Sequence, residues 1–159
     1  MVFKSMTAEE YISQRVNQFQ DWYDKKAVAA KNWYFRIRVT AVVGSVLVPV
    51  TTNAIPQFPD WSRGLTTGLS LLVSLAVALD SVYHYGDQWK NYRSTEQFLS
   101  REKFLFQTGE GLYKDMEADK AFVLLVKRCE DQIAAENSAT LNVIASSAQS
   151  ADANATKAV

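Results

Sequence analysis

The feature that most constrains this chain is a pair of uncharged apolar segments separated by a short break. No charged residue occurs from Val39 to Pro59, and none occurs from Gly64 to Leu79. A helix of about 20 apolar residues crosses the hydrocarbon core of a bilayer, which is about 30 Å thick. Each segment is therefore predicted to span a membrane, and the second span lengthens if residues 80–85 lie at the membrane surface.

The break between these segments is rich in helix-breaking residues. It contains Pro56, Pro59 and Gly64, and proline does not continue a helix interior. Two apolar helices joined by so few residues must lie antiparallel. We therefore expect an all-α membrane protein, a two-transmembrane helical hairpin with spans at residues 39–55 and 64–85 and an outer loop at residues 56–63.

The positively charged residues indicate which side of the membrane holds the termini. They gather before the first span and after the second, whereas the predicted loop carries only Arg63. Because cytoplasmic flanks of membrane helices are enriched in Lys and Arg, both termini are predicted to be cytoplasmic, with the hairpin in the inner (plasma) membrane. The flanking basic residues are Lys25, Lys26, Lys31, Arg36, Arg38, Lys90, Arg93 and Arg101. Aromatic residues at the same borders, typical of an interfacial belt, are Trp33, Tyr34, Phe35, Tyr83, Tyr85 and Trp89.

Outside the hairpin the chain shows the periodicity of amphipathic helices. Thr7, followed by Glu9 and Glu10, has the pattern of a helix N-cap with carboxylates in the first turn. Apolar residues then recur at helical spacing, both here and after the second span. The following are expected to pack together in a cytosolic bundle: Ile12, Val16, Phe19, Tyr23, Trp89, Tyr92, Leu99, Phe106, Phe122, Leu125, Val126, Cys129 and Ile133.

The predicted domain organisation has four parts. Residues 1–38 form a cytosolic N-terminal helix that runs into the first span, and residues 39–85 form the hairpin. Residues 86–137 form further cytosolic helices, the last of them from Asp115 to Asn137. Residues 138–159 are rich in Ala, Ser, Asn and Thr and have little to bury, so they are expected to form a mobile tail.

One cytosolic run resembles a known family. The pattern W-x-x-Y-R-S-T-x-x-x-L-x-x-E begins at Trp89 and continues through Phe104, Thr108-Gly109 and Tyr113. Together with the stretch Trp22-Tyr23-Asp24-Lys25-Lys26-Ala27, it resembles bacterial two-transmembrane domains of the SLATT type and their relatives of unknown function, over residues 8–136. The resemblance implies a membrane effector, with pore formation as one possibility, often encoded beside nucleotide-signalling modules. It brings no catalytic residues and singles out Tyr92, Arg93, Glu96 and Glu102.

Residues with hydroxyl groups gather on one side of the second span. At about 100° per residue, Thr67, Ser70, Ser74 and Ser81 fall within about 60° of one another. Such residues either pack membrane helices together or line a pore. The opposite, lipid-facing side is expected to consist of Leu65, Leu69, Leu72, Ala76 and Leu79. An alternative pore-lining set in the first span consists of Thr40, Gly44 and Thr51.

Asp80 is the one acidic residue in the second span. A carboxylate at the end of a membrane helix must be paired, solvated at the interface or functional. His84 follows one turn later. The two either lie in interfacial water or gate and select cations, in which case Asp80 forms a ring of negative charge at the cytoplasmic mouth.

The composition excludes some functions and leaves two. The 17 basic and 17 acidic residues give no reason to expect nucleic acid. With one His, one Cys and no Gly-rich phosphate loop, we expect no catalytic, metal or cofactor site and no enzyme activity.

Two helices cannot enclose water, so a pore needs a homo-oligomer of four or more copies in contact with membrane lipid. The predicted function is a cation-preferring channel for ions; the alternative is a membrane scaffold or adaptor whose cytosolic bundle binds a partner.

Overall fold

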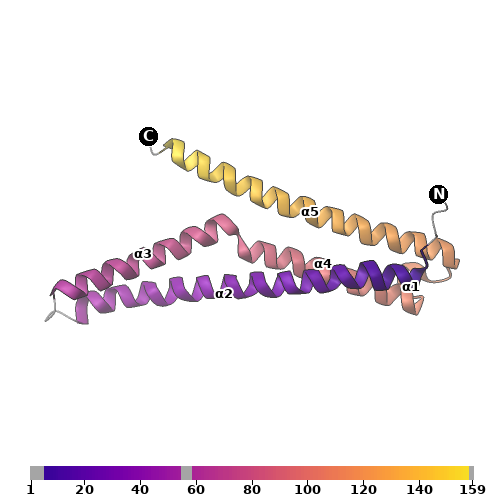
Figure 1. Cartoon of the computed structure of the whole chain (residues 1–159), viewed down its shortest axis with the longest axis horizontal. Helices are drawn as coiled ribbons and strands as arrows, with labels where there is room; N and C mark the ends of the chain where they lie inside the picture. Colours follow the sequence, from indigo (N-terminus) through magenta and orange to yellow (C-terminus); the bar gives the residue numbers. More distant parts are fainter. Residues whose placement is uncertain (1–5, 55–58, 158–159) are drawn as a thin grey trace. The chain divides into compact units, whose positions relative to one another are not determined.

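The computed structural model describes residues 6–54 and 59–157, and the regular elements in these ranges are all helices. The short helix α1 (Ala8–Tyr11) continues through a π-helical turn, η1 (Ile12–Val16), into the long helix α2 (Asn17–Ala54). The helices α3 (Pro59–Tyr83), α4 (Tyr85–Thr108) and α5 (Ala118–Lys157) follow, with a 3₁₀ turn, η2 (Gly111–Tyr113), before α5 (Figure 1). The predicted all-α class is confirmed.

Several predicted boundaries differ from the observed ones. Helix α3 begins at Pro59, so residues 59–63 of the predicted outer loop are helical, because proline is well tolerated in the first turn of a helix. The rest of that loop, residues 56–58, and the last residue of the predicted first span lie outside the described residues. Helix α5 begins at Ala118 and continues to Lys157, through most of the segment predicted to be a mobile tail. The mobility of that segment stays a prediction.

A break at His84 separates α3 from α4, and the sequence did not predict it. His84 has a φ of 49°, in the left-handed region, and its backbone N–H donates to the carbonyl of Asp80 at 3.0 Å. A left-handed residue with such a bond is a common way to end a helix. Gly86 lies inside α4 with the ring of Tyr34 against it.

The chain forms two compact units. The first, here called the bundle, comprises residues 1–29 and 87–142. The second comprises residues 30–86, here called the hairpin, and residues 143–159. Helices α2, α4 and α5 each contribute to both units.

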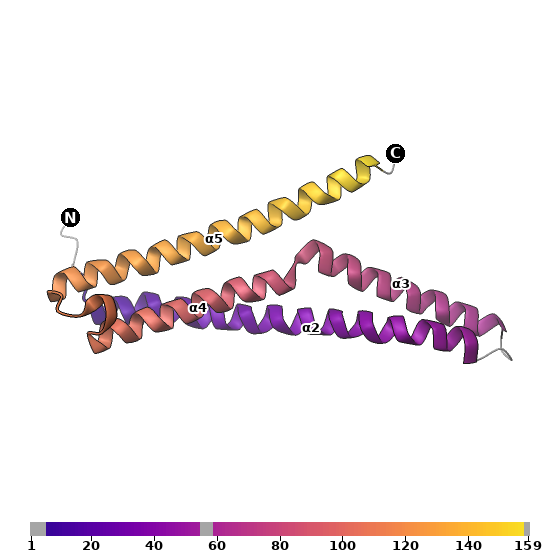
Figure 2. The ribbon, with the colours of Figure 1, turned by 180° about the vertical axis from the view of Figure 1, so that it is seen from behind.

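The bundle has a core of large side chains. Figures 1 and 2 show α1, the first part of α2, α4 and the first part of α5 side by side. Thr7 caps α1 through a reciprocal pair of hydrogen bonds with Glu10, which confirms the predicted N-cap. The fully buried residues include Val16, Tyr23, Leu99, Leu125 and Cys129, and Phe19, Tyr92, Phe106, Phe122 and Val126 pack against the core. The predicted apolar faces therefore meet, and each large buried side chain contributes about 1.5–3 kcal/mol.

In the hairpin, α2 and α3 lie side by side (Figure 2), and their contact, here called the seam, contains both small residues and larger valine, leucine and isoleucine residues. A Cβ added at Gly44 would overlap the Cγ2 of Val73, so the two backbones approach closely there. The hydroxyls of Thr51 and Thr66 share a hydrogen bond of 3.1 Å. Close approach through small residues is typical of helix pairs in membranes. The buried and half-buried residues of the seam are Ile37, Ala41, Gly44, Val48 and Thr51 on α2, and Thr66, Leu69, Val73, Ala76 and Asp80 on α3.

The outer faces of the hairpin expose large apolar side chains. On α2 these include Val42, Val43, Val46 and Leu47, and on α3 they include Leu65, Leu71, Leu72 and Leu75. Two helical stretches, Ala8–Thr51 and Arg63–Tyr83, are long enough and apolar enough to cross a membrane. The predicted lipid face needs one correction. Leu69 and Ala76 belong to the seam, because α2 packs on that side of α3.

Candidate functional site

The predicted hydroxyl stripe lies mostly on a flank of α3 that α2 does not cover. Thr67, Ser74 and Ser81 are exposed, and Ser70 is half-buried at the edge of the seam. The Oγ of Ser70 donates to the carbonyl of Thr66, one turn earlier, at 2.8 Å. At about 100° per residue, the centre of the stripe is about 100° from the centre of the seam. The hairpin thus leaves most of these hydroxyls available to another helix, to water or to ions.

The alternative set in the first span does not form one open face. Gly44 is buried against Val73, and Thr51 is half-buried and bonded to Thr66, so both take part in the seam. Thr40 is exposed. Gly44 and Thr51 of α2 therefore make contacts within the hairpin, and the polar flank lies on α3.

The structure pairs the carboxylate of Asp80 with Arg38, whereas His84 bonds to Asp80 through the backbone. The Nε of Arg38 lies 3.4 Å from the Oδ2 of Asp80, whose side chain is 23% exposed, whereas that of Arg38 is 60% exposed. The Arg38 guanidinium also lies over the ring of Tyr34, 5.4 Å from its centroid. The Nδ1 of His84 lies 3.3 Å from the carbonyl of Val82. Asp80 is thus paired within its own hairpin, and His84 serves the helix break.

The motif singled out by the resemblance joins helices of the bundle. Arg93 donates to Asp24 on α2 at 2.7 Å and lies 3.2 Å from Glu96. Glu96 also accepts a hydrogen bond from Gln20 on α2. The ring of Tyr92 lies 6.2 Å from that of Tyr23, centroid to centroid. These three motif residues therefore hold α4 to α2.

Glu102, the fourth motif residue, is the centre of a buried polar cluster. It accepts the Tyr113 hydroxyl at 2.7 Å and two parallel N–H bonds from Arg128 at 2.8 Å each. Burial alone would raise the pKa of Glu102, but the bonds from Arg128 and Tyr113 outweigh it and hold that pKa below its usual value. Burial raises the pKa of the Tyr113 hydroxyl, which stays protonated and donating.

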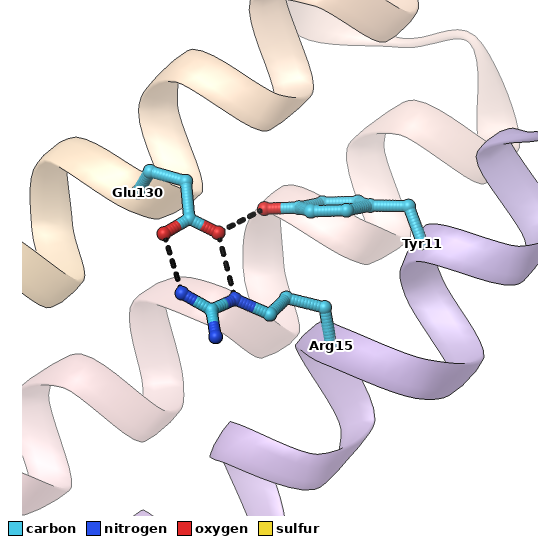
Figure 3. A network of polar contacts seen from close by, with 3 residues as sticks. All are labelled: Tyr11, Arg15 and Glu130. Carbon is cyan, nitrogen blue, oxygen red and sulfur yellow. Dashed lines mark hydrogen bonds and ion pairs between the residues drawn. The ribbon is translucent and has the colours of Figure 1, made fainter. Parts of the chain in front are cut away.

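Two further pairs of tyrosine and glutamate link the N-terminal helices to α5. Glu130 accepts the Tyr11 hydroxyl at 3.1 Å and two bonds from Arg15 at 2.9 Å each (Figure 3). The bonds from Arg15 lower the pKa of Glu130. Tyr23 donates to Glu136 at 3.1 Å. Sequence analysis missed these pairs because helical spacing marks buried positions without showing which polar groups meet across helices.

The bundle also has a surface cavity beside an exposed tryptophan. The cavity has a volume of about 410 Å³ and is lined by Gln18, Phe19, Trp22, Tyr23 and Asn137. Trp22 is 44% exposed, and the ammonium of Lys26 lies 5.5 Å from its ring centroid. Among the residues that the structure describes, no group of three or more His, Cys, Asp or Glu side chains is placed to hold a metal ion.

These features define a class of protein. It is an all-helical chain with a bundle held together by polar side-chain networks and an apolar hairpin whose two helices are long enough to cross a membrane. Comparison with known families places the chain in a family and adds no activity. The chain belongs to the family described as "Protein of unknown function (DUF4231)", whose model matches residues 18–121. The match includes the hairpin and the motif at Tyr92 to Glu102. No curated protein and no solved structure matches the chain.

Proposed function

We propose that this protein is a homo-oligomeric membrane channel in which the hydroxyl stripe of α3 faces a water-filled path. One observation carries the proposal: Thr67, Ser74 and Ser81 are exposed on a flank that the hairpin does not use, on a helix that carries no charge from Gly64 to Leu79. A hydroxyl facing lipid loses the hydrogen bonds that water would give it. Facing a central path restores those bonds and allows the hydroxyls to replace part of an ion's hydration shell.

The proposal requires several copies of the chain. One hairpin supplies two helices that already pack on each other, so four or more hairpins are needed to enclose a path. In such a ring the stripe faces the axis and the apolar flank of α3, including Leu65, Leu72 and Leu79, faces lipid or a neighbouring copy. The resemblance to SLATT-type domains, which implies membrane effectors, agrees with this arrangement.

Selectivity for cations is assigned to Asp80, modulated by Arg38. A ring of carboxylates attracts cations, and a guanidinium 3.4 Å away offsets that field. Asp80→Asn should therefore lower the ratio of cation to anion permeability, and Arg38→Gln should raise it. If the permeability ratio changed in the same direction in both variants, Asp80 would not lie in the ion path.

The decisive experiment tests which flank of α3 meets the path. A single cysteine is placed at Ser74, in a Cys129→Ala background. The matched control is a single cysteine at Leu72, two residues earlier on the apolar flank of α3, in the same background. The full-length protein is reconstituted in planar bilayers and treated with a charged thiol reagent. Current through the Ser74→Cys channel should be blocked, while current through the Leu72→Cys channel should not change. Equal responses at the two positions would assign the stripe to helix packing.

A second candidate function is a membrane scaffold or adaptor, and the cavity beside Trp22 favours it. An exposed tryptophan at a cavity edge is typical of surfaces that bind partners. A photo-crosslinking amino acid at position 22 should then give an adduct of defined mass with another protein, and Lys127, also exposed, provides the control position. A scaffold would give such an adduct and no ion current in bilayers.

A further inference from the structure

A second flank of the hairpin, on α2, combines a cation, an aromatic stack and an apolar track. Trp33, Arg36, Val43 and Leu47 follow one another at helical spacings of three, seven and four, so they share one side of α2. All four are exposed. The seam residues Ile37, Gly44 and Val48 lie about 100° away around the helix. This side of α2, here called the Arg36 flank, therefore stays open when α2 and α3 pack together.

Aromatic rings from three helices meet at the Trp33 end of this flank. The rings of Trp33 on α2 and Tyr85 on α4 are stacked, with centroids 6.2 Å apart and planes at 19°. Tyr85 stacks in turn on Tyr83 of α3, at 5.3 Å and 17°. The guanidinium carbon of Arg36 lies 5.9 Å from the ring centroid of Trp33. The His84 break positions the two tyrosines, because they stand on either side of it.

We propose that the Arg36 flank binds an anionic phospholipid, with the phosphate on Arg36 and an acyl chain along Val43 and Leu47. A guanidinium carries five N–H donors, and contact with a ring face uses none of them as a hydrogen bond. Arginine binds phosphate oxygens through such donors, often two at a time. Tryptophan and tyrosine are enriched at the headgroup level of a bilayer, where one side of a ring contacts apolar chains and the other contacts water. The stacked rings of this flank are typical of that level.

The dimensions of the flank match one leaflet of a bilayer. At 1.5 Å per residue, Leu47 lies about 16 Å along the helix from Arg36, and half of the hydrocarbon core is about 15 Å thick. A phosphate at Arg36 therefore places its acyl chain beside Val43 and Leu47. A soluble phosphate would leave this apolar track unused.

The local charge selects an anionic headgroup over a zwitterionic one. No acidic residue occurs from Lys25 to Pro59, and Lys31 is a further cation on this part of α2, whereas Arg38 is paired with Asp80 of α3. A zwitterionic headgroup carries its own ammonium group, which this charge repels. Phosphatidylglycerol, which lacks that group, is the expected ligand class.

The inference rests on insertion of the hairpin in a membrane, which is part of the proposed function. The test is native mass spectrometry of the full-length protein, released from membranes with equal amounts of phosphatidylglycerol and phosphatidylcholine of the same acyl chains. Wild-type protein should retain phosphatidylglycerol about tenfold more often. Arg36→Gln should abolish that preference, Arg36→Lys should keep part of it, and Lys127→Gln, which removes the same charge from the bundle, should leave it unchanged.

Other outcomes would overturn the inference in distinguishable ways. Displacement of the lipid by soluble glycerol phosphate would mean that phosphate alone is recognised. A disulfide between copies through Leu47→Cys, in the Cys129→Ala background, would mean that a second copy covers the flank. Protein that conducts ions but retains both lipids equally would refute the lipid site and leave the channel standing. Protein that fails to insert would refute both.

Discussion

The bundle and the hairpin distribute large and small side chains in opposite ways. In the bundle, Tyr23, Leu99 and Leu125 are fully buried. In the hairpin, small residues such as Gly44 and Ala76 let the helices approach closely at the contact, and most leucines and valines lie on the outside. The bundle gains free energy by removing large apolar surfaces from water, whereas the hairpin gains it from close backbone packing and leaves large apolar side chains exposed.

The two units also treat polar groups differently. The bundle buries Glu102 and Glu136, each with a tyrosine donor, and Glu102 also with an arginine. In the hairpin, the acidic group Asp80 lies near the end of α3 and is paired with Arg38. The difference teaches that buried charged groups lock helix positions in the bundle, while the hairpin has its ion pair near one end and only a neutral hydroxyl pair, Thr51 and Thr66, within the seam.

The largest effect is expected from removing a core side chain of the bundle. Leu125 is fully buried, so Leu125→Ala leaves a cavity and should lower the free energy of unfolding by about 2–5 kcal/mol. Val123→Ala, at an exposed position of the same helix, should change it by less than about 0.5 kcal/mol. Urea unfolding of the detergent-solubilised protein measures both. Equal effects would mean that this face of α5 is not a core.

The next effect concerns the buried ion pair. Arg128→Met leaves the Glu102 carboxylate buried without its cation and should cost roughly 2–3 kcal/mol, less than for a fully buried pair because a third of Arg128 is exposed. Adding Glu102→Gln to Arg128→Met should recover part of that loss. A double-mutant cycle in the same unfolding assay tests this coupling, and additive losses would contradict it.

A comparable or smaller effect is expected in the hairpin seam. Gly44→Val places side-chain atoms where Val73 already lies and should destabilise the pairing of α2 and α3 by about 1–3 kcal/mol. Gly68→Val is the matched control, because nothing lies within 4 Å of a Cβ at that position. Thermal unfolding in detergent should separate the two. If Gly68→Val were the more damaging change, the packing of the hairpin would be wrong.

The smallest effect is the pH dependence of the bundle. Because the pKa values of Glu102 and Glu130 are lowered in the folded protein, their contribution to stability is present above the unfolded value of about 4.5. It should be lost as the pH falls through the lowered folded values. Glu102→Gln should flatten this loss in urea unfolding measured between pH 6 and pH 3. An unchanged slope in that variant would show that Glu102 does not contribute.

The sequence predicted the helices and their apolar faces, because helical spacing is a local signal. It did not predict the break at His84, which depends on a backbone bond to Asp80. It placed Asp80 at the membrane border and named pairing as one outcome, but the partner Arg38 follows from the register of α2 against α3. The pairs of Glu130 and Glu136 with Tyr11 and Tyr23 depend in the same way on the register of α5.

The most direct test of the account asks whether the hairpin crosses a membrane and leaves the bundle in the cytoplasm. Single cysteines are introduced at Arg63, at the start of α3, and at Gln107, near the end of α4, in a Cys129→Ala background. Intact cells are treated with a membrane-impermeant thiol reagent. The account predicts that Arg63→Cys is labelled and that Gln107→Cys is labelled only after permeabilisation. Labelling of Gln107→Cys in intact cells, or protection of both sites, would contradict it.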